Sequence, residues 1–372
     1  MKKLNLILLV ALISFNSCIT TNEDVKKDMF EGDTEQNKNV VYLLSDDNDE
    51  FNMYNRAIVN LNNDVDTLFI TVRIKGSVGV PKDISVELTP YFVRERVNSA
   101  NNESLDKESL FYQYNKSKFD DDYENWANFL PEANYSFLPE NIIEGSTPGT
   151  IRLKATIKQG KVNTTIPVLI KDLHTLSPDS LYFLEYKITK VNDALVDTNK
   201  KNVLIPICWK NAWSSSREPI IYDMIGKQHD WRVGDEMPLV GSSRWITGAP
   251  TLYPIGKNEI RIGAGIEMDQ INWDKKTKRQ LIDANSIVLI IDKDNQIDFR
   301  PYKDIEVEKV LPGDIFYDEN HTNRYFTEKI ITTSGFTKYF KTFTLHYRYR
   351  NYKMSDDVYR YCKLTLRYEY EP

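Results

Sequence analysis

Residues 67–74 read TLFITVRI, with an aliphatic side chain at every second position. This period sends one set of side chains to a core and the other to solvent, as in a strand of an antiparallel sheet. The same alternation returns in residues 84–88 and 151–157, and further strand candidates follow at 165–170, 181–191 and 202–207. About seven short strands within residues 40–210 predict an immunoglobulin-like β-sandwich.

The alternation stops at residues 90–129, a long, charged and aromatic stretch. Within it, residues 91–96 have a spacing that is compatible with a helix. We therefore expect one or two short helices, inserted between strands of the sandwich.

The β period resumes beyond residues 209–219, where three consecutive serines interrupt the strands. Strand candidates include residues 286–292, 296–302, 341–350 and 359–370. Asp292–Asn295 separates two of them, as a hairpin turn would. The last two candidates predict a closing β-meander. We expect a second domain at residues 211–372, an antiparallel β-sandwich or β-barrel, and an all-β chain.

Composition limits the function classes. A chain of 372 residues favours two domains, because single cores stop growing at roughly 250–300 residues. Aromatic residues make up 12% of it and favour strands. The formal net charge is −6 and there is no basic block, which argues against binding to nucleic acid or to anionic lipid.

The N-terminus predicts export. Residues 1–18 combine a basic start, an apolar run too short to span a bilayer, and Ser17 directly before Cys18. This pattern resembles a lipoprotein signal peptide that ends at a lipidated Cys18; the alternative is a plain secretory signal with an incidental cysteine. Residues 19–39 are polar and predict a disordered tether. Glu23 and Asp24 resemble an acidic export tag, or are simply a solvated charge run. We expect an outer-membrane protein that is lipid-anchored and faces the cell exterior.

The two remaining cysteines, Cys208 and Cys362, lie in strand-like apolar runs. We expect both to be free, buried thiols rather than a disulfide. No Cys or His spacing of the zinc type occurs, and alternating oxygen ligands at residues 292–298 fit a hairpin turn better than a calcium loop. The sequence predicts neither a cofactor nor a metal site.

Several segments together resemble a two-domain family of Bacteroidetes surface lipoproteins. They are residues 84–88, Asn101-Asn102, residues 130–137 (LPEANYSF), a turn at Gly145, residues 151–157 and residues 181–184 (LYFL). These resemble an N-terminal immunoglobulin-like domain found in surface glycan-binding proteins and ahead of family-eighteen endoglycosidases. Residues 341–349 (KTFTLHYRY) resemble its frequent partner, a β-rich domain of unknown function. The insertion at residues 103–127 is longer than this family's pattern predicts.

The resemblance implies a polysaccharide or host glycan as ligand, and an outer-membrane transporter complex as partner. Catalysis has little support in the sequence, because no glycosidase signature, no barrel of alternating helices and strands, and no nucleophile elbow occur. The four histidines are scattered, and His346 is expected on an exposed, polar strand face.

Tryptophans provide the candidate site. Five of the six fall within residues 209–273, and three of these stand beside polar residues. A sugar stacks its apolar face on an aromatic ring while neighbouring polar groups bond its hydroxyls. Core packing is the competing interpretation, and it is the one we favour for Trp209. The glycan-binding candidates are Trp213, Asp230, Trp231, Arg244, Trp245, Trp273 and Asp274.

The leading hypothesis is therefore a non-catalytic glycan-binding accessory protein of a polysaccharide-uptake system. In it, the N-terminal domain is a spacer and the C-terminal domain holds the ligand. The alternatives are an adhesin or structural surface protein that binds a protein partner, which an extended flat surface with an open edge strand would favour, and a glycoside hydrolase, which would need a carboxylate pair in a cleft.

Overall fold

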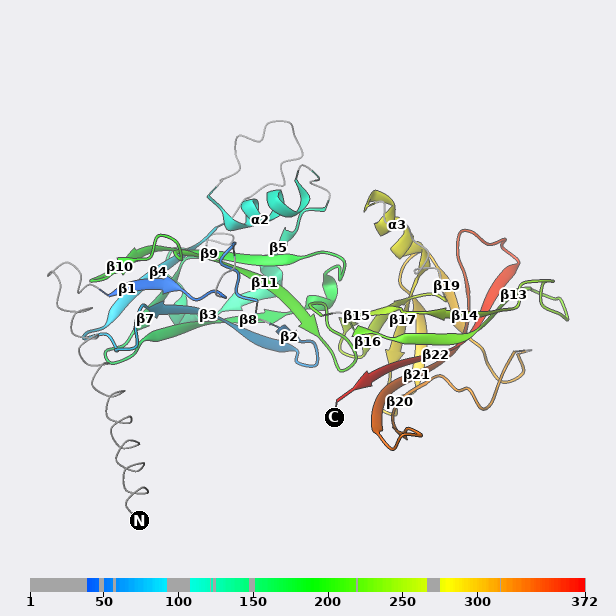
Figure 1. Cartoon of the computed structure of the whole chain (residues 1–372). Coiled ribbons are helices and arrows are strands. Elements are labelled where there is room, and N and C mark those ends of the chain that lie inside the picture. The colour runs from blue at the N-terminus through cyan, green and yellow to red at the C-terminus, as the bar shows by residue number, and fades with distance from the viewer. Residues whose placement is uncertain are drawn as a thin grey trace, which may run out of the picture.

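The computed structural model describes residues 39–46, 50–55, 58–91, 108–120, 122, 125–146, 151–218, 220–265, 275–314 and 316–371 (Figure 1). These residues form two β-sandwiches that follow each other along the chain. The expected all-β class is confirmed. The predicted signal peptide, Cys18 and nearly all of the tether lie outside the described residues.

The N-terminal sandwich has one sheet in the order β10-β1-β3-β8-β6 and a second in the order β2-β11-β9-β4-β7, with β5 paired to β9. In the strands with alternating side chains, every second side chain is buried. The buried side chains of the two sheets meet between them in a single core. Its strands are β1 (Val40–Leu43), β2 (Ile58–Asn60), β3 (Val65–Ile74), β4 (Ile84–Pro90), β5 (Asn128–Phe129), β6 (Tyr135–Phe137), β7 (Leu153–Ile157), β8 (Asn163–Lys171), β9 (Tyr182–Val191), β10 (Leu195–Val196) and β11 (Asn202–Lys210).

The insertion contains a helix, as expected, although residues 92–96, which belong to the stretch with helix-compatible spacing, lie outside the described residues. Helix α2 (Leu110–Phe119) begins after Ser109, and the buried carboxylate of Glu185 on β9 accepts hydrogen bonds from Ser109 Oγ and from the amides of Leu110 and Phe111, at 2.7–3.1 Å. Unpaired amides at a helix start favour a negative charge, so Glu185 docks the helix on the sheet. Short 3₁₀ turns follow at η3 (Glu132–Asn134), η4 (Pro139–Asn141) and η5 (Leu173–Thr175).

The C-terminal domain has a sheet in the order β12-β15-β16-β17-β18 and another in the order β14-β13-β22-β21-β19, with β20 paired to β21. A second core lies between them. The elements are β12 (Ile220–Ile221), β13 (Asp223–Arg232), β14 (Arg244–Gly248), β15 (Thr251–Gly256), β16 (Glu259–Gly263), α3 (Lys275–Asn285), β17 (Ser286–Ile291), β18 (Ile297–Pro301), β19 (Glu306–Lys309), β20 (Arg324–Ile331), β21 (Thr337–Arg350) and β22 (Val358–Tyr370).

Local expectations for this domain are confirmed. Strands β20, β21 and β22 form the closing meander. Asp292 Oδ1 accepts hydrogen bonds from the amides of Asp294 and Gln296, at 2.9 and 2.8 Å, in a hairpin turn between β17 and β18. The two described cysteines form no disulfide with each other; Cys362 is buried as expected, whereas Cys208, on β11 of the N-terminal domain, is only half-buried.

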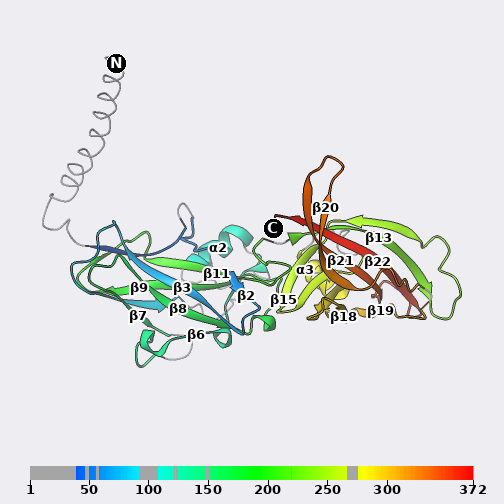
Figure 2. The ribbon, with the colours of Figure 1, turned by 90° about the horizontal axis from the view of Figure 1, so that it is seen from below.

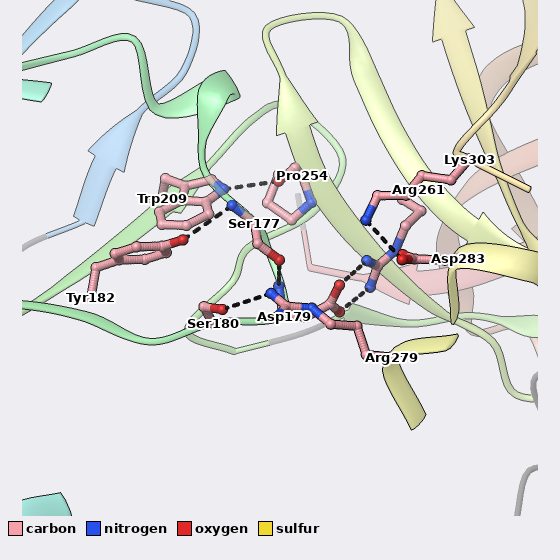
Figure 3. Close-up of polar contacts among 10 residues, drawn as sticks. All are labelled: Ser177, Asp179, Ser180, Tyr182, Trp209, Pro254, Arg261, Arg279, Asp283 and Lys303. Carbon is pink, nitrogen blue, oxygen red and sulfur yellow. Dashed lines mark hydrogen bonds and ion pairs between the residues drawn. The ribbon is translucent and has the colours of Figure 1, made fainter. Parts of the chain in front are cut away.

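The two sandwiches are joined by side chains as well as by the chain (Figure 3). Trp209 is buried, as expected, and its indole Nε1 donates to Pro254 O at 2.9 Å. Asn211 Nδ2 donates to the carbonyls of Gly256 and Glu259, both at 3.0 Å. These contacts fix the C-terminal domain against the end of the N-terminal sandwich.

The arrangement is elongated, with the two sandwiches end to end (Figures 1 and 2). The first described strand, β1, lies beside β10 at the end of the N-terminal sandwich that is far from the C-terminal domain. Strands β13 and β14 extend toward the opposite end of the molecule. The start of β1 therefore lies far from the C-terminal domain.

Candidate functional site

The candidate site lies on the outer face of the β14-β13-β22-β21-β19 sheet, the face turned away from the domain core. Strand β13 directs Met224 and Gln228 inward and, by alternation, Lys227, His229 and Trp231 outward. On β22, the core receives Cys362 and Leu364, whereas Tyr361 and Lys363 lie on the outer face.

Strand register places these side chains in rows across the sheet. Lys227 lies opposite Trp245 on β14 and opposite Lys363 on β22, which in turn lies opposite His346 on β21. The next row contains His229, Tyr361, Arg348 and Glu308. Gly226 permits the close approach of β13 to β22, because a Cβ there would lie 2.1 Å from Lys363 O.

The loop of residues 310–323, described except for residue 315, covers one side of this face. Its Phe316 stacks on His229 at a ring distance of 5.0 Å and meets Trp231 edge-on at 4.5 Å. Asp318 of the loop pairs with Lys363, and Asn323 Nδ2 donates to His346 O at 2.9 Å. The loop is thus attached to the sheet by aromatic and polar contacts.

Beside the loop is a pocket of about 340 Å³, near the lower end of the range for small-ligand sites. Its walls combine aromatic rings with groups that donate or accept hydrogen bonds. Lining residues are Lys227, His229, Phe316, Tyr317, Asp318, His346, Tyr361, Cys362 and Lys363.

Histidines in and beside the pocket are held neutral. Burial lowers the pKa of His346 to about 4, and burial also lowers the pKa of His229 and His321. The expectation that His346 is exposed is wrong, since only 3% of the residue is accessible. The covering loop, through Asn323 and His321, encloses a strand face that the local pattern marks as outward.

Two predicted site tryptophans lie on this outer face, in different environments. Trp245 is 68% exposed, with the Lys227 ammonium 4.3 Å from its ring centroid. Trp231 is only 6% exposed, because Phe316 and Tyr361 pack around it, and its Nε1 donates to Asp235 O at 3.0 Å. Trp245 has a ring surface for a ligand, whereas Trp231 supports the covering loop.

The other predicted site residues lie away from the pocket or are already bound to another side chain. Trp213 lies in the domain core, edge-on to Tyr325, which corrects its assignment as a ligand contact. Asp230 is engaged by Arg360 at 2.5 and 2.9 Å. Arg244 is exposed, but it lies opposite the core residue Gln228. Trp273 and Asp274 lie outside the described residues.

Sequence reasoning missed Lys227, His229, Tyr317 and Lys363. The pattern Lys227-x-His229-x-Trp231 was a usable signal, because alternation places all three on one strand face. The pairing of β13 with β22 and the position of the loop are nonlocal and left no comparable signal.

Chemically, the pocket supports binding. Its one carboxylate, Asp318, has a pKa lowered by the hydrogen bond from Lys363. Within the described ranges, no group of three His, Cys, Asp or Glu residues is arranged to hold a metal ion. No described helix is long and apolar enough to cross a membrane.

Comparison with known proteins gives the following matches. A family model described as "-like, C-terminal" matches residues 201–367, which is less than half of the chain. No curated protein matches the sequence. A Bacteroides ovatus protein of unknown function aligns with a TM-score of 0.54 and 14% identity, over 89% of this chain and 94% of its own.

A multidomain protein including DUF1735, also from Bacteroides ovatus, aligns with a TM-score of 0.52 and 14% identity, over 88% of this chain and 94% of its own. At such identities the likeness establishes the fold alone. The chain thus has the fold of these Bacteroides proteins, with the two-domain, β-rich architecture expected from its sequence.

Proposed function

We propose that this protein is a non-catalytic surface lipoprotein that binds a polysaccharide or host glycan as an accessory to an outer-membrane uptake system. The observation that carries the proposal is the exposed ring of Trp245 next to the pocket on the outer face of the C-terminal sheet. An open indole ring beside polar groups is the combination that a sugar requires.

In this proposal, a sugar ring stacks on Trp245 and its neighbour along the glycan enters the pocket. Lys227, His229 and the half-exposed Tyr317 supply hydrogen bonds to hydroxyl groups. The site lies on a strand face with a loop on one side, so a long glycan can continue beyond it.

The elongated arrangement suits a surface receptor. A lipid on Cys18 and the tether of residues 19–39 would hold the protein at the membrane, with the N-terminal sandwich as spacer. The joint through Trp209 and Asn211 would keep the C-terminal face at a fixed distance and orientation. A transporter complex in the same membrane is the proposed recipient of the glycan.

A binding role fits the pocket better than hydrolysis. Glycoside hydrolases use two carboxyl groups separated by roughly 5–10 Å. Among the residues that line this pocket, Asp318 is the only carboxylate, and Lys363 neutralises it. The pocket therefore lacks the second carboxyl group that the hydrolase alternative requires.

The test is affinity electrophoresis of residues 20–372, which include every described residue, through gels that contain plant, microbial or host glycans. Retardation by at least one glycan is expected, and Trp245→Ala should abolish it. Phe336→Ala is the matched control, because Phe336 is an equally exposed aromatic residue on the β20–β21 turn. Unretarded migration in every gel, with an intact β-type circular dichroism spectrum, would refute the proposal.

One feature favours the adhesin alternative. Strand β20 pairs with β21, and beyond the bridge from Arg324 to Gln296 its other edge has no strand partner among the described residues. The hairpin of β20 and β21 projects from the domain (Figure 2). Ile331 and Phe336 are exposed near its tip. An open edge can accept a strand from another protein. If no glycan binds, this hairpin is the surface to test against protein partners.

A further inference from the structure

Two lysines stand directly opposite each other at the candidate site. Lys227 on β13 and Lys363 on β22 are register partners on the outer face, and both line the pocket. Like charges in directly opposed cross-strand positions destabilise a sheet. An arrangement of this kind becomes favourable when anions lie beside both ammonium groups.

Only one of the two lysines has an anion from the protein. Lys363 pairs with Asp318 of the covering loop. Lys227 is exposed and makes no ion pair within the part of the chain that the structure describes; its recorded contact is with the ring of Trp245. One positive charge at the pocket is therefore uncompensated.

Neighbouring cations on the same face are compensated. Arg348 pairs with Glu308, Arg350 with Glu306 at 2.6 Å, and Arg367 with Glu328 at 2.9 Å. Glu306 and Glu308 come from β19, which adjoins β21, whereas Glu328 comes from β20, one strand beyond β21 from Arg367. These pairs neutralise the face away from the pocket. Unlike these arginines and Lys363, Lys227 has no carboxylate partner among the described residues. It lies next to the exposed ring of Trp245.

His229 adds a second unmet group. Its Nδ1 is enclosed and has no hydrogen-bond partner among the described residues. Burial, and then the charge of Lys227, lower the pKa of His229, so its neutral ring offers one donor and one acceptor. The enclosed Nδ1 itself is out of reach of a ligand, so His229 can meet one only through the part of its ring that lines the pocket.

We propose that the pocket recognises an anionic sugar unit, carrying a carboxylate or a sulfate group, whose charge is bound by Lys227 while its ring or that of its neighbour stacks on Trp245. The inference rests on the proposed glycan-binding function and names the class of glycan. Lys227 provides the charge and the donors, and His229 supplies a further polar contact to the same unit. Neutral glycans leave the opposed lysines uncompensated and bind more weakly.

The experiment measures dissociation constants for residues 20–372 with glycan pairs that differ only in charge. Sialyllactose against lactose, and polygalacturonate against its carboxyl-reduced form, test a carboxylate; chondroitin sulfate against its desulfated form tests a sulfate. At least one anionic member should bind more tightly than its partner. Lys227→Met should weaken that binding about tenfold to a hundredfold, the range for a lost charge-assisted hydrogen bond, and should weaken binding of the neutral partner by a clearly smaller factor.

Two further variants separate charge from folding. Lys227→Arg keeps the charge and should retain the preference. Lys329→Met removes an exposed lysine from β20, away from the pocket, and should change nothing. Equal binding of both members of every pair, or an unaltered preference in Lys227→Met, would overturn the inference and leave glycan binding standing. Binding to none of the glycans would overturn both.

Discussion

Asp179 of the N-terminal sandwich and Arg261 of the C-terminal domain, 82 residues apart in the chain, are joined by two hydrogen bonds of 2.5 and 2.6 Å (Figure 3). The guanidinium also lies between the rings of Tyr253 and Tyr302, at 4.7 and 4.9 Å from their centroids. Because Arg261 is only 2% exposed, this bidentate pair forms a buried link between the two halves of the molecule.

Asp179→Ala should lower the free energy of unfolding by about 3 kcal/mol, because it leaves a buried guanidinium without its counter-charge. Chemical denaturation followed by tryptophan fluorescence would measure the loss. Glu369→Ala removes the partner of Lys338 in an exposed pair and should cost less than about 1 kcal/mol. Equal effects of the two substitutions would show that the buried pair does not stabilise the joint.

The two tryptophans of the outer face should differ in their contribution to stability. Trp231→Ala removes a buried ring from between Phe316 and Tyr361 and should lower the free energy of unfolding by about 3 kcal/mol. Trp245→Ala removes an exposed ring and its contact with Lys227, and should cost less than about 1 kcal/mol. Thermal and urea unfolding of both variants would measure the two losses in the free energy of unfolding. A large loss for Trp245→Ala would mean that this ring is structural.

Stability should fall as the pH drops toward 4. The pKa of His346 is about 4 in the folded protein, against an ordinary value of 6.5, because burial disfavours its charged form. Between these values the unfolded chain binds more protons, so stability present above pH 6.5 is lost as the pH falls, by up to about 1.4 kcal/mol per unit for this group.

The comparison that isolates His346 is the wild-type protein against His346→Gln, with urea unfolding measured from pH 7.5 to 4. The Gln variant should depend less steeply on pH. His229 and His321 also have lowered pKa values and remain in both proteins, so the difference between the curves reports His346 together with its interaction with the neighbouring His321. Parallel curves for the two proteins would contradict the prediction.

Helix α2 should depend on a single carboxylate. Glu185→Ala leaves three donors at the helix start without their acceptor, so the amides of residues 110–113 should exchange with deuterium faster than in the wild type. Glu108→Ala removes a neighbouring exposed acid and is the control. Unchanged exchange in Glu185→Ala would mean that the apolar contacts of Phe111 and Leu110 hold the helix alone.

Anchoring should depend on Cys18. In a host that processes lipoproteins, the wild type should incorporate labelled palmitate and fractionate with membranes, whereas Cys18→Ser should do neither. Cys208→Ser is the matched control, since Cys208 is a free, half-buried thiol of the folded region. A wild type that incorporates no palmitate and does not fractionate with membranes would support the alternative of a plain secretory signal with an incidental cysteine. Membrane fractionation of Cys18→Ser would contradict the prediction.

Much of the fold was readable from the sequence, because the alternation of side chains within a strand is a local property. Residues 67–74 and 341–350 lie in β3 and β21, and the turn after Asp292 is set by its own carboxylate. Polar neighbours marked Trp231 and Trp245 alike as candidates, yet only Trp245 has an exposed ring. Local sequence patterns could not predict which of the outward-facing side chains remain exposed to solvent.

The sequence by itself determined the all-β class, the closing meander and a set of tryptophans on polar segments. Only the tertiary structure decided that Trp213 fills the core, that Phe316 covers Trp231, and that Lys227 meets Lys363. The physical reason is range: strand alternation and turn chemistry act between residues a few positions apart, whereas strand order, register and the packing of a covering loop join segments distant in the chain.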